Sequence, residues 1–201
     1  MPIEEDERGA YIMNSKDLCL MPRLREVIES HPDSLKIEGR NRSEYYVGSV
    51  VRAYRNAIDA YVRDPDGFDP QPFMNDLNVL ESRGYTTAFF DGPLPPEAHD
   101  YESTHSKSDY HAAGVITNID DKNITLELRN EIKQGDEITF ILPLTTDKIS
   151  VRLDAIINAK NGEELPKMSA GQKNSLIIPI EKIPEQYRNK MVPLVLAYKR
   201  K

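Results

Sequence analysis

Hydrophobic residues between positions 44 and 63 recur with the spacing of an amphipathic helix. Separated by three or four positions, they would share one buried face: Val47, Val50, Val51, Tyr54, Ala57, Ile58 and Tyr61. Ser43 offers a hydroxyl that caps a helix N-terminus, and residues 64–67 (Asp-Pro-Asp-Gly) end the run. The pattern predicts a long helix that carries Arg52 and Arg55 on its other faces, where they either contact phosphate or are simply solvated.

Shorter elements are predicted on both sides of this helix. Residues 34–38 alternate between apolar and charged side chains, which predicts a short strand. Before it, residues 10–13 predict another strand and residues 15–30 a helix. After the long helix, residues 70–83 predict a third helix, opened by prolines, and residues 84–90 an extended segment. Strands that alternate with helices are typical of a β/α architecture.

The second half of the chain changes to short runs typical of β-strands. Six are predicted, with turns between them: residues 113–119, 123–128, 137–142, 149–157, 175–180 and 193–198. Six short strands with few helices indicate a small closed barrel or a sandwich. Residues 91–110 show no periodicity and predict a linker. The sequence therefore predicts an α/β part at 1–90, a linker at 91–110 and a β domain at 111–201.

Charged residues gather at the end of the predicted strand at 34–38. In a β/α architecture, the loop after a strand's C-terminal end carries ligand-binding side chains. Lys36, Glu38 and Arg40 would all lie near such a loop. Either they bind a charged ligand there, or Lys36 and Glu38 pair with each other or with neighbouring strands and only hold the sheet together.

Charge and hydropathy limit the kinds of partner. The 201 residues contain 26 Lys and Arg against 33 Asp and Glu, a net charge of −7. This balance argues against a protein that binds nucleic acid through bulk charge, although a local basic patch can still do so. Apolar runs of about 18 residues, the length of a transmembrane helix, do not occur. The acidic first eight residues are not expected to act as a signal peptide.

Candidate catalytic groups are few. The sequence contains no Gly-x-Ser-x-Gly, His-Glu-x-x-His or Walker motif. Cys19, the single cysteine, lies in an apolar run where a buried structural thiol is more common than a nucleophile. One cysteine excludes an internal disulfide, so a reducing, cytoplasmic setting is expected. His99, His105 and His111 have a spacing typical of neither a helix face nor a structural zinc site, so no metal site is predicted.

Six stretches of the chain resemble the C-terminal part of the U32 family, also labelled peptidase U32 or collagenase-like protease. They are residues 9–18 (GAYIMNSKDL), 34–40 (SLKIEGR), 45–46 (YY), 51–55 (VRAYR), 58–59 (ID) and 82–86 (SRGYT). The resemblance is dense up to residue 90 and looser to about residue 180. Within the family, the pattern is nearest to the prephenate-dependent tRNA hydroxylases, which make 5-hydroxyuridine at the wobble uridine.

The resemblance implies a fold for each part of the chain. Residues 1–90 would form the closing strands and helices of an incomplete (β/α) barrel. Residues 111–201 would form a small antiparallel β-barrel of the translation-factor domain 2 type. A complete eight-stranded β/α barrel needs about 250 residues. The chain is therefore expected to be a fragment of a longer protein.

The resemblance also implies a function and its partners. The chain would be part of a tRNA-modifying enzyme, with tRNA and the N-terminal part of the same enzyme as partners. Prephenate would be a co-substrate, and an iron–sulfur cluster would be held outside this chain, because one cysteine does not supply the ligands of such a cluster. The isolated chain would then be inactive.

Cationic and aromatic side chains in the matching stretches are the expected contacts to substrate or RNA, because cations meet phosphates or carboxylates and tyrosines stack on unpaired bases. These candidates are Lys16, Lys36, Glu38, Arg40, Arg42, Tyr45, Tyr46, Arg83 and Tyr85. No catalytic residue is assigned. Two alternatives stay open: a U32 collagenase-like peptidase, and a binding module without activity of its own.

Overall fold

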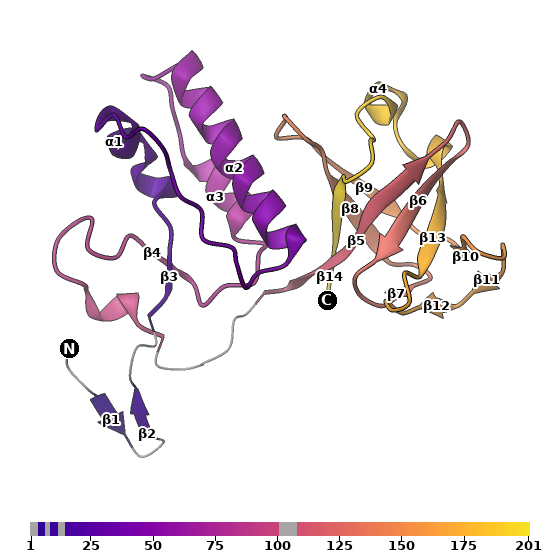
Figure 1. Cartoon of the computed structure of the whole chain (residues 1–201), viewed down its shortest axis with the longest axis horizontal. Helices are drawn as coiled ribbons and strands as arrows, with labels where there is room; N and C mark the ends of the chain where they lie inside the picture. Colours follow the sequence, from indigo (N-terminus) through magenta and orange to yellow (C-terminus); the bar gives the residue numbers. More distant parts are fainter. Residues whose placement is uncertain (1–3, 7–8, 12–14, 101–107) are drawn as a thin grey trace. The chain divides into compact units, whose positions relative to one another are not determined.

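The computed structural model describes residues 4–6, 9–11, 15–100 and 108–201. The chain groups into two compact units, which we call the N-terminal unit (residues 1–36 and 57–108) and the β unit (residues 37–56 and 109–201). The long helix α2 (Glu44–Arg63; Figure 1) contributes its first part to the β unit and its last part to the N-terminal unit.

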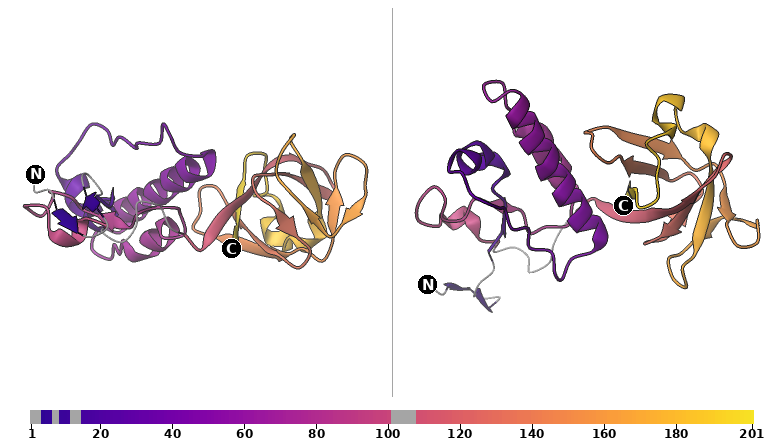
Figure 2. Two further views of the ribbon diagram at one scale, coloured as in Figure 1. Left: turned by 90° about the horizontal axis from the view of Figure 1, so that it is seen from below. Right: turned by 45° about the horizontal axis from the view of Figure 1, so that its top comes forward.

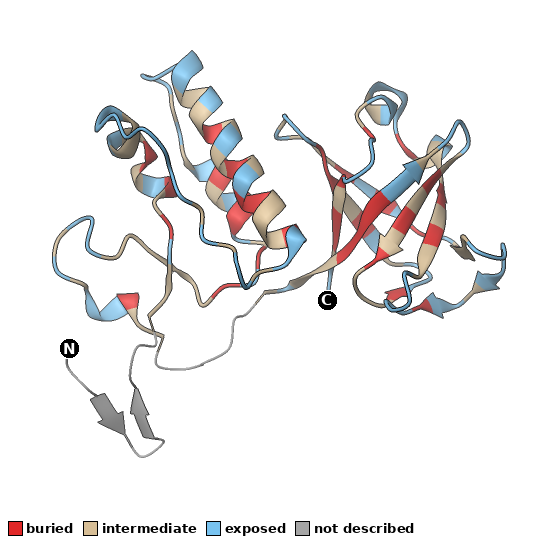
Figure 3. Ribbon diagram, in the orientation of Figure 1, coloured by how far each residue is buried: buried red, intermediate tan, exposed pale blue. Residues whose placement is uncertain are grey.

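Helix α2 confirms the prediction from the hydrophobic spacing. The Ser43 hydroxyl accepts a hydrogen bond from the backbone N–H of Tyr46 at 3.2 Å, which is an N-terminal cap. Figure 3 shows buried positions along one side of the helix. Val50, Ala53 and Ala57 are buried, whereas Val51 is 47% exposed. The buried face is therefore rotated slightly from the predicted one, and Val51 lies outside it.

Apart from α2, the N-terminal unit consists of short elements. They are β1 (Glu4–Asp6), β2 (Gly9–Tyr11), β3 (Asp17–Leu18), the 3₁₀ turn η1 (Met21–Arg23), α1 (Leu24–Glu29), α3 (Gln71–Leu77), β4 (Tyr85–Thr86) and the 3₁₀ turn η2 (Pro96–Ala98). Strands β1 and β2 form an antiparallel pair, and β3 and β4 pair in parallel. A parallel pair requires a long crossover connection, which here runs through the helices.

The predicted helix over residues 15–30 is wrong for its first half. Asp17 donates its N–H to the Gly84 carbonyl at 2.9 Å, and Cys19 donates to the Thr86 carbonyl at 2.9 Å, so this stretch is a strand. Only residues 24–29 are α-helical, after a 3₁₀ turn that contains Pro22. Proline has no N–H and its ring clashes with the preceding turn, so the helix does not extend back through it.

The predicted strand at residues 34–38 is also wrong, because these residues are irregular. A strand requires the backbone of a neighbour, and among the described ladders none involves this segment. Leu35 is 41% exposed, so the alternation of apolar and charged residues does not bury one face. Lys36, Glu38 and Arg40 consequently do not lie at the end of a strand.

Three other predictions near these elements need smaller changes. The strand predicted at 10–13 overlaps β2, although its last two residues lie outside the described residues. Helix α3 ends at Leu77, earlier than predicted, because the chain turns there before it reaches β4. Only Tyr85 and Thr86 of the extended segment at 84–90 are a strand, and Gly84 precedes them with φ of +83°. The linker at 91–110 contains η2, and its residues 101–107 are outside the described part.

The β unit is built on an eight-stranded antiparallel sheet that curls around its own core (Figure 2). Its order is β11-β10-β13-β6-β5-β14-β8-β9, which leaves β11 and β9 at the two edges. The strands are β5 (Tyr110–Ile119), β6 (Asn123–Leu128), β8 (Glu137–Ile141), β9 (Lys148–Arg152), β10 (Ile156–Asn158), β11 (Glu164–Leu165), β13 (Ser175–Pro179) and β14 (Leu196–Arg200). The 3₁₀ turn η3 (Ile180–Lys182) and helix α4 (Glu185–Arg188) connect β13 to β14.

All six predicted strands of this half are present, and one of them is divided. The run predicted at 149–157 forms β9 and β10, which lie toward opposite edges of the sheet. The chain leaves the β8–β9 ladder at Leu153, whose carbonyl accepts the Gly135 N–H at 2.7 Å. Every second side chain of a strand points into the core. In β6 these side chains are Ile124, Leu126 and Leu128, and all three are buried.

A small side sheet pairs β7 (Ile132–Lys133) with β12 (Lys167–Met168). The Lys167 ammonium lies 3.0 Å from the Glu131 carboxylate, and Lys133 lies 3.4 Å from it. The hydrogen bond from Lys167, followed by that from Lys133, lowers the pKa of Glu131 below its usual value, against the opposing effect of burial. Glu131 therefore adds stability above its usual pKa, which is lost as the pH falls through the lowered pKa.

We expect Glu131→Gln to lower Tm slightly at pH 7, and the gap to wild type to close as the pH falls through the lowered pKa of Glu131, since wild type then loses the same charge. Thermal unfolding by circular dichroism at a series of pH values measures this gap. Glu164→Gln, at an exposed carboxylate on β11, is the control. A gap that stays constant with pH would contradict the role given to the Glu131 charge.

Candidate functional site

Four of the residues predicted to bind substrate belong to the N-terminal unit: Lys16, Lys36, Arg83 and Tyr85. Three of them meet around the β3–β4 pair. The Lys16 side chain lies against Gly84, within 3.4 Å of where a Cβ would stand. Arg83 is paired with Asp17 at 3.2 Å, and the Tyr85 hydroxyl donates to the Leu77 carbonyl at 2.9 Å. Arg83 and Tyr85 therefore have structural partners. Lys36 lies in the irregular segment, and its side chain is exposed.

The other five predicted residues belong to the β unit: Glu38, Arg40, Arg42, Tyr45 and Tyr46. They lie just before α2 and in its first turn. The Arg42 guanidinium lies over the Tyr46 ring, 4.8 Å from its centroid, a cation–π contact. Arg40 is exposed, and its backbone N–H faces the Glu38 carboxylate at 3.4 Å. Arg40, Arg42 and Tyr46 thus present two cations and an aromatic ring at the start of the helix.

Tyr45 takes a different position from Tyr46. It is only 7% exposed, and its ring lies 6.3 Å from that of Tyr198 on β14. Tyr198 in turn meets Tyr110 of β5 edge-on, with ring centroids 5.4 Å apart. Tyr45 is therefore the first of three tyrosines in contact, a row that we call the tyrosine row (Tyr45, Tyr198, Tyr110). The sequence does not reveal this row, because its members come from α2, β5 and β14, which only the folded chain brings together.

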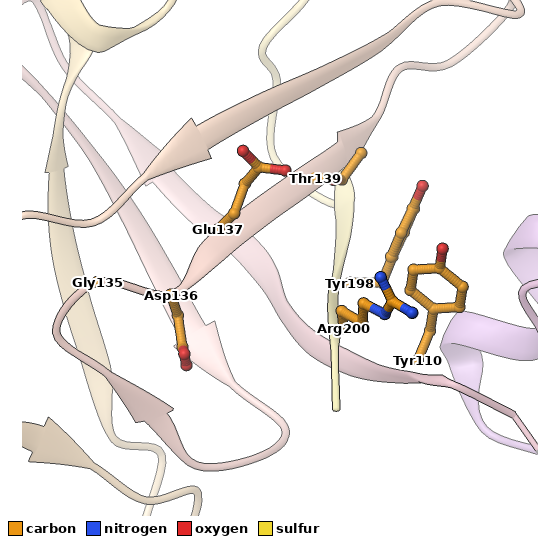
Figure 4. A pocket seen from close by; sticks show the side chains of 7 residues that line it. All are labelled: Tyr110, Gly135, Asp136, Glu137, Thr139, Tyr198 and Arg200. Carbon is orange, nitrogen blue, oxygen red and sulfur yellow. The ribbon is translucent and has the colours of Figure 1, made fainter.

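A pocket of about 420 Å³ lies beside the tyrosine row (Figure 4). It is lined by residues of β5, β8 and β14 and of the turn before β8: Tyr110, Gly135, Asp136, Glu137, Thr139, Tyr198 and Arg200. We call it the β14 pocket. The strand register explains its lining, because Tyr198 lies opposite Thr139 and Arg200 lies opposite Tyr110. No feature of the sequence singled out this face, because the register of β5, β14 and β8 is what brings its residues together.

Charge is divided unequally between the two units. The β unit carries 18 Lys and Arg against 15 Asp and Glu, a net charge of +3, whereas the N-terminal unit carries 8 against 18, a net charge of −10. The acidity of the whole chain therefore resides in the N-terminal unit. The net positive charge of the β unit favours the approach of an anionic partner.

The described residues offer no set of metal ligands. Among them, no group of three or more His, Cys, Asp or Glu side chains is arranged to hold a metal ion. Cys19 is buried, with its sulfur 3.8 Å from that of Met74, and it is the single cysteine of the chain. These residues do not fit an iron–sulfur cluster, which uses about four ligands. His99 and His111 share no metal group, and His105 lies outside the described residues.

A membrane-spanning segment is not found either: none of the helices in the described part of the chain is both long and apolar enough to cross a bilayer.

Comparison with known proteins assigns the two parts of the chain. Residues 2–100 match the family model of peptidase family U32, and residues 108–189 match the model of the peptidase family U32 C-terminal domain. The chain belongs to peptidase family U32.

Named relatives of this U32 chain include two tRNA hydroxylation proteins and a collagenase. tRNA hydroxylation protein P1 of Bacillus subtilis is 38% identical over 141 residues, which cover 69% of this chain and 33% of that protein. tRNA hydroxylation protein P of Escherichia coli is 32% identical over 182 residues, covering 88% and 38%. The collagenase of Porphyromonas gingivalis is 26% identical over 175 residues, covering 81% and 48%.

The U32 chain spans about a third of the length of the two tRNA hydroxylation proteins. Among solved structures, the C-terminal domain of a Geobacillus thermoleovorans U32 peptidase aligns with a TM-score of 0.35 at 19% identity, covering 44% of this chain and 91% of that domain.

Proposed function

We propose that this U32 chain is the C-terminal part of a tRNA-modifying enzyme that forms 5-hydroxyuridine at the wobble position, and that its β unit contacts the tRNA. The observation that carries the proposal is the similarity to tRNA hydroxylation proteins at 38% and 32% identity, over as much as 88% of the chain. The positive balance of the β unit supports it, because phosphate contacts dominate affinity for nucleic acids.

The proposal extends to the fold of the whole protein. Residues 1–90 would supply the closing strands and helices of a (β/α) barrel, an arrangement supported by the parallel β3–β4 pair and its helical crossover. The curled sheet of the β unit would be a barrel of the translation-factor domain 2 type. The remaining strands of the (β/α) barrel would come from the length of the relatives that this chain does not span.

The redox chemistry would reside in that other part of the protein. An iron–sulfur cluster would be held there, since the described residues do not fit one, and prephenate would serve as co-substrate. This chain's role would be to bind and orient tRNA in a cytoplasmic enzyme. The chain alone would not complete the reaction.

Peptide hydrolysis is the second candidate, favoured by the 26% identity to a collagenase. A cysteine mechanism would use Cys19, the single cysteine of the chain. Its side chain is buried, with 4% exposure, and faces Met74. A buried thiol in apolar surroundings is a poor nucleophile, so this candidate has less support than tRNA modification.

Charge reversal at the start of α2 tests the proposed function. We expect the full chain to bind tRNA, and Arg40→Glu with Arg42→Glu to weaken binding about tenfold, because two phosphate-seeking cations become anions. The slope of log Kd against log salt should also fall, by about one for each phosphate that the variant no longer neutralises. Fluorescence anisotropy with labelled tRNA at several salt concentrations measures both.

A matched control separates local contact from bulk charge. Lys122→Glu with Lys173→Glu makes the same change in net charge at two other exposed positions of the β unit. We expect this pair to change Kd by less than about threefold, since exposed charges beyond a Debye length are screened. Equal losses of tRNA affinity in the two double variants would mean that the effect comes from net charge and not from a local contact. A wild-type chain that binds no tRNA would contradict the proposed function itself.

A further inference from the structure

We propose that the β14 pocket binds one unstacked nucleobase of single-stranded RNA. This inference rests on the proposed function, and it assigns to the substrate a contact that lies away from the start of α2. The pocket is formed entirely by residues of the β unit, and its volume of about 420 Å³ lies in the lower part of the range for small-ligand sites, roughly 300–1,000 Å³. It therefore suits a single nucleotide rather than a duplex.

The pocket lies on the face of the sheet opposite the hydrophobic core. Successive residues of a strand point to opposite faces. Ile138 and Phe140 of β8 are fully buried in the core, so Glu137 and Thr139 point to the other face. Side chains on the face that carries the pocket therefore do not pack in the hydrophobic core. On this face, Tyr198 packs against Tyr45 of α2, and Glu137 and Arg200 line the pocket beside it.

The tyrosine row holds a stacking surface in place. Tyr198 is 7% exposed and contacts Tyr45 on one side and Tyr110 on the other, with the Tyr110 ring at 89° to its own. Tyr110 is only partly buried, so part of its ring faces the pocket. Aromatic rings that are fixed by packing offer a stacking surface at low entropic cost. Stacking on such rings is the usual way in which proteins hold unpaired bases.

Two charges of opposite sign complete the site. Figure 4 shows Arg200 beside Tyr110 and Tyr198, and Glu137 on the neighbouring strand. Within the described part of the chain, neither Arg200 nor Glu137 has an ion-pair partner. Asp136, by contrast, is paired with Lys199 at 2.6 Å and accepts the Lys133 N–H at 2.9 Å, so it serves the turn before β8. Arg200 and Glu137 are therefore the charged groups of the pocket lining that make no ion pair with another described residue.

This combination selects a base over a phosphate or another anion. The Glu137 carboxylate repels an anion but accepts hydrogen bonds from the N–H groups on the edge of a base. The Arg200 guanidinium is planar, so it stacks on a base or donates to its carbonyl oxygens. In a duplex the base faces are covered by their neighbours. An unpaired loop is therefore the form of RNA that fits the pocket.

Removal of the Tyr110 ring tests the inference. Binding of the full chain is measured to a labelled RNA hairpin with an unpaired loop and to a fully paired duplex of equal length. We expect Tyr110→Leu to weaken hairpin binding about tenfold, because stacking on an aromatic ring typically contributes about 5- to 150-fold per base. Duplex binding should not change. Tyr110→Phe should retain hairpin affinity, since it retains the ring.

The two charges are tested in the same assay. Arg200→Gln and Glu137→Gln should each weaken the hairpin complex about threefold to tenfold. Tyr187→Leu, which removes a partly exposed tyrosine of α4 elsewhere in the β unit, is the matched control and should have no effect. Circular dichroism of each variant confirms that the sheet is intact.

The outcomes separate this inference from the proposed function. If the wild-type chain binds tRNA and the hairpin but Tyr110→Leu changes neither, the pocket assignment is wrong and the proposed function stands. If Tyr110→Leu weakens hairpin and duplex equally, the pocket does not distinguish an unpaired base, and the assignment is again wrong. If the wild-type chain binds no RNA, both fail.

Discussion

Replacing Gly114 with alanine is expected to lower the free energy of unfolding of the β unit by about 3 kcal/mol, the upper end for overpacking of a core. Gly114 lies on the central strand β5, opposite Leu128 of β6 and Ala197 of β14. A Cβ at this position would stand 2.4 Å from the Glu127 carbonyl oxygen and 2.9 Å from Leu126 Cγ. Relief would require the β5 and β6 backbones to separate, which breaks ladder hydrogen bonds.

Urea unfolding followed by tyrosine fluorescence or circular dichroism measures this loss, and the absence of tryptophan makes tyrosine the natural probe. Gly162→Ala is the control, because nothing lies within 4 Å of its Cβ position while its φ is +72°. Gly162→Ala should lower the free energy of unfolding by only about 1 kcal/mol, the cost of a left-handed backbone at a residue with a side chain. Equal losses in the two variants would show that the close approach of β6 is not what requires glycine at Gly114.

Hydrophobic spacing predicted the elements that bury a face over several residues. The strand at 123–128 is typical: Ile124, Leu126 and Leu128 alternate with polar residues, and all three are buried. Helix α2 was predicted for the same reason at a period of 3.6. The segment at 34–38 has a similar but shorter pattern and is irregular. Two alternations are too few to distinguish a buried face from chance, and backbone partners far along the chain decide whether a strand forms.

Long-range pairing also explains why the candidate site was only partly predicted. Tyr45 was singled out from its local motif, but its contact with Tyr198 depends on where β14 joins the sheet. Tyr110 stood at the end of a predicted linker, with nothing nearby to mark it as functional. The net charge of −7 pointed away from nucleic acid because it averages two units of opposite sign. Such a division becomes visible once the fold assigns each residue to a unit.

Replacing Arg52 with alanine is expected to lower the free energy of unfolding of the β unit by about 2 kcal/mol, the usual loss for hydrogen bonds from a charged group. The Arg52 Nε donates to the Leu142 carbonyl at 2.8 Å, and Nη2 donates to the Asp147 carbonyl at 3.1 Å. Both acceptors flank the turn between β8 and β9. One planar guanidinium thus joins the first part of α2 to both ends of that turn, where the sequence indicated either a solvated side chain or a phosphate ligand.

Lysine does not replace this arginine, because an ammonium is a point charge that does not span both carbonyls. Arg52→Lys should therefore recover less than half of the loss. Arg55→Ala, at an exposed position on the same helix, should cost less than about 0.5 kcal/mol. Denaturant unfolding gives the three energies, and hydrogen exchange of the amides of residues 142 and 144–147 locates the effect, with faster exchange expected in Arg52→Ala alone. Since Tyr45 is in the first turn of the same helix, a helix released at Arg52 also uncovers Tyr198, and hairpin affinity should fall with stability. Unchanged exchange at residues 142 and 144–147 would mean that Tyr45 and its neighbours hold the helix to the sheet without the arginine.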